Sequence, residues 1–269
     1  MPSSLRFIED EDQVVIDVNL KNQLQTIQAG RALKSFELAG PRSKIYFDPS
    51  KLRCALATCG GLCPGLNDII RAIVLELYHG YGVRNIYGIR YGLRGFIPDY
   101  GHDLIELQPE AVVSIHEMGG SVLGSSRGPQ DIEAIVDSLE RMNIGILFLI
   151  GGDGTLKAAT LIADTIARRN LKISVIGVPK TIDNDIFLID RSFGFDTAVG
   201  VAVDVIRSAH NEATSAPNGI GLVKLMGRHS GWIAVMSGIA GGADMILIPE
   251  VPFDIDKENI VPVSAPRGS

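Results

Sequence analysis

Short apolar runs alternate with helical patterns along most of this chain, and this alternation restricts the fold more than any other feature. The clearest apolar run, 144–150, reads IGILFLI and is followed at once by a glycine-rich turn. Since parallel strands are joined by helical crossovers, the alternation predicts a parallel sheet covered by helices on both faces. We therefore expect an α/β protein with a doubly wound, Rossmann-like sheet domain and a second α/β domain.

The expected elements follow from these runs. Strands are expected at 52–58, 85–89, 144–150, 173–177, 219–225 and 245–248, and helices at 66–79, 155–169, 196–213 and 231–240. Residues 1–50 show poor periodicity and are expected to form an N-terminal extension. Ligands of such sheets bind beyond the carboxyl ends of the strands, which is where the polar and glycine-rich clusters fall.

Composition excludes several classes of protein. The 269 residues are 46% hydrophobic, but no apolar stretch approaches the ~20 residues of a membrane span. A net charge of −6 argues against non-specific nucleic-acid binding. The first twelve residues lack the apolar segment of a signal peptide. Cys54, Cys59 and Cys63 favour reduced, packed thiols over a redox or metal role, so we expect a cytoplasmic protein.

Two loops could hold phosphate. Gly60, Gly61 and Gly65 lie between a strand and a helix, where backbone N–H groups can approach an anion, although a tight turn without ligand would look alike. The second loop, GGDGT (151–155), adds a carboxylate and a hydroxyl after the strongest strand. Asp153 could hold Mg²⁺ directly or through water, or could simply cap a helix.

The loop PKTIDND (179–185) carries two carboxylates two residues apart. In an extended backbone Asp183 and Asp185 point to the same side, so one could act as a general base beside the other. Lys180 would supply a cation for a transferring phosphoryl group. Taken alone, a capping loop with solvated acids would explain the same residues.

Further charged residues follow other strands. Arg228, in MGRHSGW (226–232), could grip a phosphate, whereas His229 beside it is more simply a surface residue. Glu250 could accept hydrogen bonds from a polyol, or be a solvated loop acid. Arg127 precedes a helix and could meet a nucleotide phosphate, or form a weak surface ion pair.

Several motifs, taken in order, resemble the 6-phosphofructokinases. They are GGLCPGLND (60–68), GSSRGPQD (124–131), GGDGT (151–155), PKTIDND (179–185), SFGFDTA (192–198), GIGLVKLMGR (219–228) and IPE (248–250). They look like the plant and trypanosome ATP-dependent branch, which is akin to the pyrophosphate-dependent enzymes. The resemblance covers residues 40–260.

The resemblance implies ATP-dependent phosphorylation of fructose 6-phosphate in glycolysis, with Mg²⁺ and ATP. Asp183 would be the base, with Thr181, Asp185 and Lys180 beside it. The phosphoryl-donor site would be formed by Gly60, Arg127, Gly128, Gly152, Asp153, Gly154 and Thr155, with Asp153 organising the metal. The sugar phosphate would meet Thr181, Ile182, Asp183, Met226, Gly227, Arg228 and Glu250.

The resemblance also implies a domain plan: a donor domain at 51–193 and a partial sugar-phosphate domain at 194–260. The family continues well beyond Glu250, whereas 261–269 matches nothing expected there, so we expect a truncated or altered end and little turnover from this chain alone. A homo-oligomer, dimer or tetramer, is expected for the complete protein, with no nucleic-acid or membrane partner. Three alternatives remain: a pyrophosphate-dependent enzyme, another kinase with a GGDGT loop such as an NAD kinase, and a non-catalytic fragment.

Overall fold

The computed structural model describes residues 7–253 and divides into two compact units, Met1–Asp48 and Pro49–Ser269. In the first unit, β1 (Gln13–Val15) pairs antiparallel with β2 (Ser35–Glu37), and α1 (Leu20–Gln28) connects them. The side chain of Asn19 caps α1 by accepting from two backbone N–H groups. These short elements lie in the segment that its poor periodicity led us to expect as an N-terminal extension.

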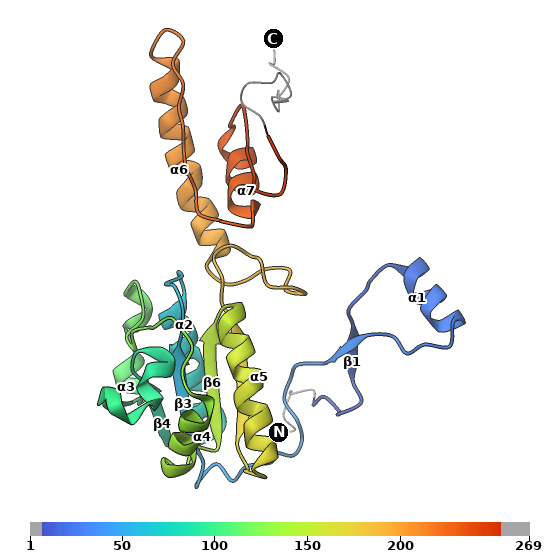
Figure 1. The fold of residues 1–269 in the computed structure, drawn as a ribbon, viewed down its shortest axis with the longest axis vertical. Coiled ribbons are helices and arrows are strands. Elements are labelled where there is room, and N and C mark those ends of the chain that lie inside the picture. Colours follow the sequence, from blue (N-terminus) through green and yellow to red (C-terminus); the bar gives the residue numbers. More distant parts are fainter. Residues whose placement is uncertain (1–6, 254–269) are drawn as a thin grey trace, which may run out of the picture. The chain divides into compact units, whose positions relative to one another are not determined.

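The second unit contains a five-stranded sheet (Figure 1). Its strands are β3 (Arg53–Thr58), β4 (Asn85–Ile89), β5 (Leu104–Glu106), β6 (Ile146–Gly151) and β7 (Ser174–Pro179), in the order β5-β4-β3-β6-β7. Four strands are parallel, as expected, but β5 runs antiparallel to β4 at one edge. The sheet is therefore mixed, because the short connection from β4 turns the chain back without a helical crossover.

Helices cover both faces of this sheet. They are α2 (Leu66–Leu75), the short α3 (Pro109–Val112), α4 (Ile132–Arg141) and α5 (Asp153–Arg168). In Figure 1, α4 and α5 lie in front of the strands and α2 lies behind them. The helix expected at 66–79 ends as an α-helix at Leu75 and continues as a π-helical turn, Glu76–Gly80. Short 3-10 turns cover Gly92–Phe96, Pro98–Tyr100 and Ile115–Glu117.

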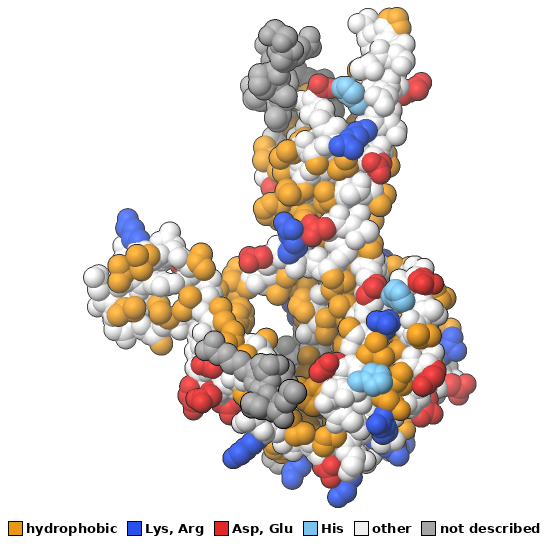
Figure 2. All heavy atoms as spheres, turned by 180° about the vertical axis from the view of Figure 1, so that it is seen from behind, with side chains coloured by type: hydrophobic (Ala, Val, Ile, Leu, Met, Phe, Trp, Pro, Cys, Tyr) orange, Lys and Arg blue, Asp and Glu red, His pale blue; other side chains and the backbone are white. Residues whose placement is uncertain are grey.

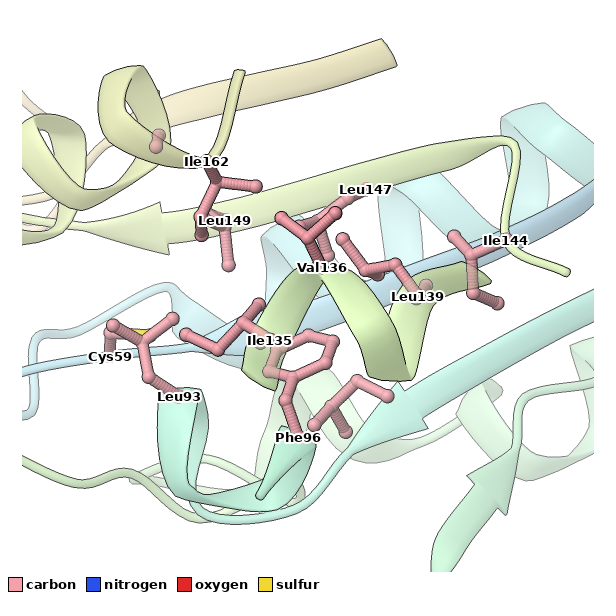
Figure 3. Packing of buried hydrophobic residues seen from close by; sticks show 14 of the residues in the cluster. Cys59, Leu93, Phe96, Ile135, Val136, Leu139, Ile144, Leu147, Leu149 and Ile162 are labelled. Carbon is pink, nitrogen blue, oxygen red and sulfur yellow. The ribbon is translucent and has the colours of Figure 1, made fainter. Parts of the chain in front are cut away.

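The main core joins the sheet to α4 and α5. Leu147 and Leu149 of β6 meet Ile135 and Leu139 of α4, and Ile162 of α5 closes the cluster from the other end, as Figure 3 shows. All five side chains are fully buried. Each such side chain contributes about 1.5–3 kcal/mol on leaving water, so this packing holds the loops at the strand ends on a rigid base.

After the sheet, α6 (Phe195–Thr214) and α7 (Trp232–Gly241) pack against each other. A smaller buried cluster of Phe195, Ala202 and Ile233 lies between them. The expected strands at 219–225 and 245–248 were wrong: neither segment pairs with a strand in the described part of the chain. Their apolar residues resemble buried strands, but a strand forms only where a neighbour completes its hydrogen bonds.

The α6–α7 pair exposes apolar side chains on the face seen in Figure 2. Val201 and Val205 of α6 and Met236 and Ile239 of α7 are between 38% and 66% exposed. Within residues 7–253, no helix is long and apolar enough to cross a membrane. The end of the expected sugar-phosphate domain, 254–260, and the atypical tail expected at 261–269 lie outside the described residues.

Candidate active site

The sheet topology places the loops that follow β3, β6 and β7 next to one another, at the carboxyl ends of these parallel strands. From β3 the chain first proceeds outward to β4 and then returns to β6 on the other side, so the strand order reverses between β3 and β6. In open α/β sheets, such a reversal leaves a crevice outside the carboxyl ends of the strands. The loops that follow β3, β6 and β7 all begin at this crevice, and they carry most of the expected site residues.

Lys180 ties two of these loops together. Its side chain is only 5% exposed, and its Nζ donates to the backbone carbonyl of Gly61. Its backbone N–H donates to Gly151 O at 2.9 Å, so the same residue also holds the end of β6. Burial lowers the pKa of Lys180, and nearby Arg127 lowers it further, while Cys63 and Cys59 act in the opposite direction.

The segment 125–128 forms a second wall of the crevice. Gly60 N–H donates to Ser126 O at 3.0 Å, and Ser125 Oγ donates to Gly60 O at 2.6 Å. A Cβ on Gly61 would lie 3.1 Å from Nη2 of Arg127, which places the exposed guanidinium against the glycine loop. Two cations, Lys180 and Arg127, therefore lie at one glycine-rich turn, as a phosphate site requires.

The loop after β6 opens directly into α5. Asp153 is the first residue of that helix, is largely exposed, and pairs with Lys157 at 2.7 Å. Thr155 is buried, and its hydroxyl contacts the thiol of Cys59. No cluster of three or more metal-ligating side chains occurs among residues 7–253, but Mg²⁺ typically needs only one or two carboxylates when phosphates and water supply the rest. The single carboxylate of Asp153 fits that pattern.

The two acids of the 179–185 loop have different surroundings. Asp185 Oδ1 accepts from Thr181 Oγ1 at 2.8 Å, and Thr181 Oγ1 in turn accepts from the backbone N–H of Asp183. Oδ1 of Asp183 is buried and has no hydrogen-bond partner within the described range 7–253. One carboxylate is thus held by its loop, and the other is left with an unsatisfied acceptor oxygen.

The pKa of Asp183 is raised, chiefly by burial and secondly by the charge of Asp185. The charge of Arg228, in the 226–232 segment, acts in the opposite direction and lowers this pKa. A desolvated carboxylate between a like and an unlike charge is the environment that makes a general base.

The remaining expected residues lie on the α7 side. Glu250 Oε1 accepts from the backbone N–H of Gly231, at the start of α7, at a distance of 2.7 Å. This bond holds one carboxylate oxygen, while the residue as a whole is exposed, so its role toward a substrate stays a prediction. Met226 is 66% exposed, and Arg228 and His229 are exposed as well. The structure therefore brings Arg228 within electrostatic reach of Asp183, whereas the Met226 side chain lies open to solvent.

A cavity of about 460 Å³ opens beside the glycine loop. Its lining residues are Arg90, Tyr91, Arg94, Gly101, His102, Asp103, Ser125 and Ser126. The rings of Tyr91 and His102 lie 4.7 Å apart, and Arg90 lies over the Tyr91 ring. Sequence reasoning missed this lining, although the glycine-rich YGLRG segment directly after the strand 85–89 is the same signal that identified the other loops.

Sequence reasoning also missed the residues that hold the 179–185 loop. Asn184 Oδ1 accepts from the backbone N–H of Ser192 at 2.8 Å, while Ser192 Oγ donates to Thr181 O. From the other side, Ser230 Oγ donates to Asp183 O at 2.7 Å. Small polar residues at such positions carry no sequence signal, because the contacts span 8 to 47 residues of chain.

Known proteins resemble this chain throughout the site region. A family model described as phosphofructokinase matches residues 53–262. ATP-dependent 6-phosphofructokinase from Borreliella burgdorferi is 54% identical, over 83% of this chain and 50% of its own length. ATP-dependent 6-phosphofructokinase 7 from Arabidopsis thaliana is 50% identical, over 83% of this chain and 46% of its own length. The chain thus spans about half the length of these curated relatives.

Solved structures agree in fold. The crystal structure of pyrophosphate-dependent phosphofructokinase from Marinobacter aquaeolei matches with a TM-score of 0.66 and 26% identity, over 76% of this chain and 54% of that one. Pichia pastoris phosphofructokinase in the T-state also gives a TM-score of 0.66 and 26% identity, over 84% of this chain and 26% of that one. The family model covers well over half of the chain, and the motifs that it spans are the loops assembled at the sheet edge. This chain belongs to the phosphofructokinase family.

Proposed function

We propose that this chain is the catalytic core of an ATP-dependent 6-phosphofructokinase, which transfers the γ-phosphoryl group of ATP to the 1-hydroxyl of fructose 6-phosphate. The observation that supports this most directly is the buried Oδ1 of Asp183, which has no hydrogen-bond partner among residues 7–253, next to a crevice where Lys180 and Arg127 meet a glycine loop. Phosphoryl transfer needs positioning and charge neutralisation around one proton acceptor, and this arrangement offers both.

Asp183 would accept the proton of the sugar's 1-hydroxyl as its oxygen attacks the γ-phosphorus. The bond from that phosphorus to the leaving ADP oxygen then breaks, which gives fructose 1,6-bisphosphate and ADP. A raised pKa makes Asp183 a stronger base than an exposed aspartate, and the charge of Arg228 offsets part of that rise. Asp185 and Thr181 would keep the loop in shape through their mutual hydrogen bond.

The donor phosphates would lie against Gly60, Gly152 and Thr155, with Arg127 and Gly128 on the other side. Lys180 lies at the base of this site, where it would neutralise charge on the transferring group. Asp153 would hold Mg²⁺ carried in with the nucleotide, and the ion would neutralise phosphate charge when bound.

Two observations favour ATP over pyrophosphate. A Cβ on Gly154 would meet no atom of residues 7–253 within 4 Å, so the start of α5 leaves open space next to the phosphate loop. The cavity lined by Tyr91, His102, Arg90 and Arg94 adjoins the Gly60 loop through Ser125 and has room for a nucleoside. Pyrophosphate would use neither space.

The sugar phosphate would bind between the 179–185 loop and the start of α7. Thr181, Ile182 and Asp183 form one side, and Met226, Gly227, Arg228 and Glu250 form the other. Because Glu250 is anchored on the Gly231 N–H, its second oxygen would be presented to a substrate hydroxyl. We further propose a homo-oligomer, dimer or tetramer, in a reducing compartment such as the cytoplasm, consistent with three free, buried thiols.

A pyrophosphate-dependent enzyme is the second candidate. The Marinobacter aquaeolei phosphofructokinase is named pyrophosphate-dependent, and a buried lysine at position 180 suits a small, highly charged anionic donor. Relatives that share about half of their residues with this chain are named ATP-dependent, whereas the Marinobacter aquaeolei protein shares 26%. We therefore rank ATP first.

The experiment compares both donors side by side in the full-length protein, with fructose 6-phosphate and a coupled assay. ATP is expected to support turnover and pyrophosphate is not. Gly154→Asp is expected to lower kcat/KM for ATP at least tenfold, because a carboxylate would repel the nucleotide phosphates, while Gly154→Ala stays close to the parent. Since position 154 is open, these substitutions leave the fold intact. Pyrophosphate turnover with ATP inert would reject the ATP assignment.

A further inference from the structure

Ser230 joins the two sides of the proposed substrate site. It lies in the segment that carries Arg228, and its side chain is buried at 6% exposure. Its Oγ donates to the backbone carbonyl of Asp183 across 47 residues of chain, at 2.7 Å. This hydrogen bond links the segment before α7 directly to Asp183, whose buried Oδ1 has no partner in the part of the chain that the structure describes.

The backbone on each side of Ser230 is held by a close contact, at Gly227 before it and at Gly231 after it. Gly227 has φ of +118°, and a Cβ there would lie 2.1 Å from the carbonyl oxygen of Ser230, so the turn 227–230 closes tightly on itself. Gly231, the next residue, donates its N–H to Glu250. Arg228 therefore occupies a turn whose ends are held, and Ser230 attaches that turn to Asp183.

Other contacts also hold the 179–185 loop, but they connect it to other parts of the fold than the Arg228 turn. Ser192 and Asn184 bind the loop to the segment directly before α6. Ile182 packs on the α6–α7 cluster through apolar contact, which resists separation but does not fix rotation. The Ser230 hydroxyl adds a directed bond at the backbone carbonyl of Asp183 itself, from the turn that carries Arg228.

We propose that Ser230 is a positioning residue: its hydroxyl holds Asp183 and the Arg228 turn in the relative arrangement that proton transfer needs. This inference rests on the proposed function, since it assigns Ser230 an effect through the base. Losing a directed contact that misplaces a reacting group by about 1 Å can cost about 10²-fold in rate. We expect Ser230→Ala to lower kcat about 10- to 100-fold, with KM for ATP changed less than about twofold.

Ser237 supplies the matched control. It is a fully buried serine of α7 whose Oγ donates to Ile233 O within its own helix, so Ser237→Ala removes a comparable hydroxyl without touching the Asp183 loop. Its kcat should stay within about threefold of the parent. Ser230→Thr retains the hydroxyl and should recover most of the rate. Ser230→Cys, close in volume but a weak donor, replaces the alanine variant if that variant does not fold.

A double-mutant cycle with Asp183→Asn decides the question in the full-length protein. If Ser230 acts through the base, Ser230→Ala should lower the residual rate of Asp183→Asn by less than about threefold. The same factor in both backgrounds, or a loss no larger than that of Ser237→Ala, would overturn the inference. A near-parental kcat for Asp183→Asn alone would instead reject the proposed function. Failure of the Ser230 inference can therefore be told apart from failure of the proposed function.

Discussion

At the scale of single residues, two aspartates of one loop have different chemistry because of their hydrogen bonds. The sequence predicted that Asp183 and Asp185 act as a pair, and both do belong to one loop. It could not reveal that the Thr181 hydroxyl satisfies Asp185 while Oδ1 of Asp183 is buried without a partner among the described residues. It also could not reveal that the backbone of this loop is held by the Ser192 hydroxyl at Thr181 O and, across 47 residues of chain, by the Ser230 hydroxyl at Asp183 O.

The raised pKa of Asp183 predicts a pH-dependent stability difference. A carboxyl whose pKa is higher in the folded than in the unfolded state favours folding below its unfolded pKa, and that contribution is lost as pH rises through the folded value. Asp183→Asn abolishes this titration, so its Tm should exceed that of the parent at pH 7, by about 2–4 °C for each kcal/mol relieved. The difference should shrink as the pH falls toward about 4. Thermal unfolding at several pH values tests this, and a difference that grows in acid would contradict it.

At the scale of elements, the apolar runs that pair within the sheet were predicted correctly as strands. Two similar runs, 219–225 and 245–248, were predicted as strands but pair with no other described segment. The runs that became β3, β4, β6 and β7 were expected to within two residues at every end, because their apolar patterns are those of buried parallel strands. Residues 219–225 carry a similar pattern, yet Ile220 is 91% exposed. Hydrophobicity alone cannot say whether a pairing partner exists.

Gly194, at the start of α6, packs closely against the β3–α2 loop, and this close packing predicts that a larger side chain there destabilises the protein. Gly194 has φ of +84°, and a Cβ there would lie 2.3 Å from Cys63 Sγ and 2.5 Å from Pro64 O. Gly194→Ala should therefore destabilise the protein by about 1–3 kcal/mol through strain and overpacking, and should also weaken donor binding. Urea unfolding measures the loss.

Gly200, six residues further along α6, is the control for that variant. A Cβ there meets nothing within 4 Å, and the position is exposed. Gly200→Ala should stabilise the helix by about 0.5–1 kcal/mol, because alanine loses less backbone entropy than glycine. Equal effects of the two substitutions would show that Gly194 is not sterically constrained.

At the scale of the whole molecule, the sheet is the part that the sequence describes best. Its alternating pattern predicted a doubly wound α/β domain, and the loops at its carboxyl edge contain the expected donor residues. The cavity beside Tyr91 escaped prediction because its lining comes from three separate segments. The separation of donor and sugar-phosphate domains near residue 193 stays a prediction, whereas the contacts divide the chain after Asp48.

The central claim is that Asp183 is the base of an ATP-dependent phosphoryl transfer, and one measurement tests it most directly. Steady-state rates of the full-length protein and of its Asp183→Asn variant are compared with ATP and fructose 6-phosphate. Asparagine keeps the shape of the side chain but accepts no proton, so kcat should fall by about 10²–10⁴-fold while KM for the sugar phosphate changes much less. A kcat within about threefold of the parent would contradict the account.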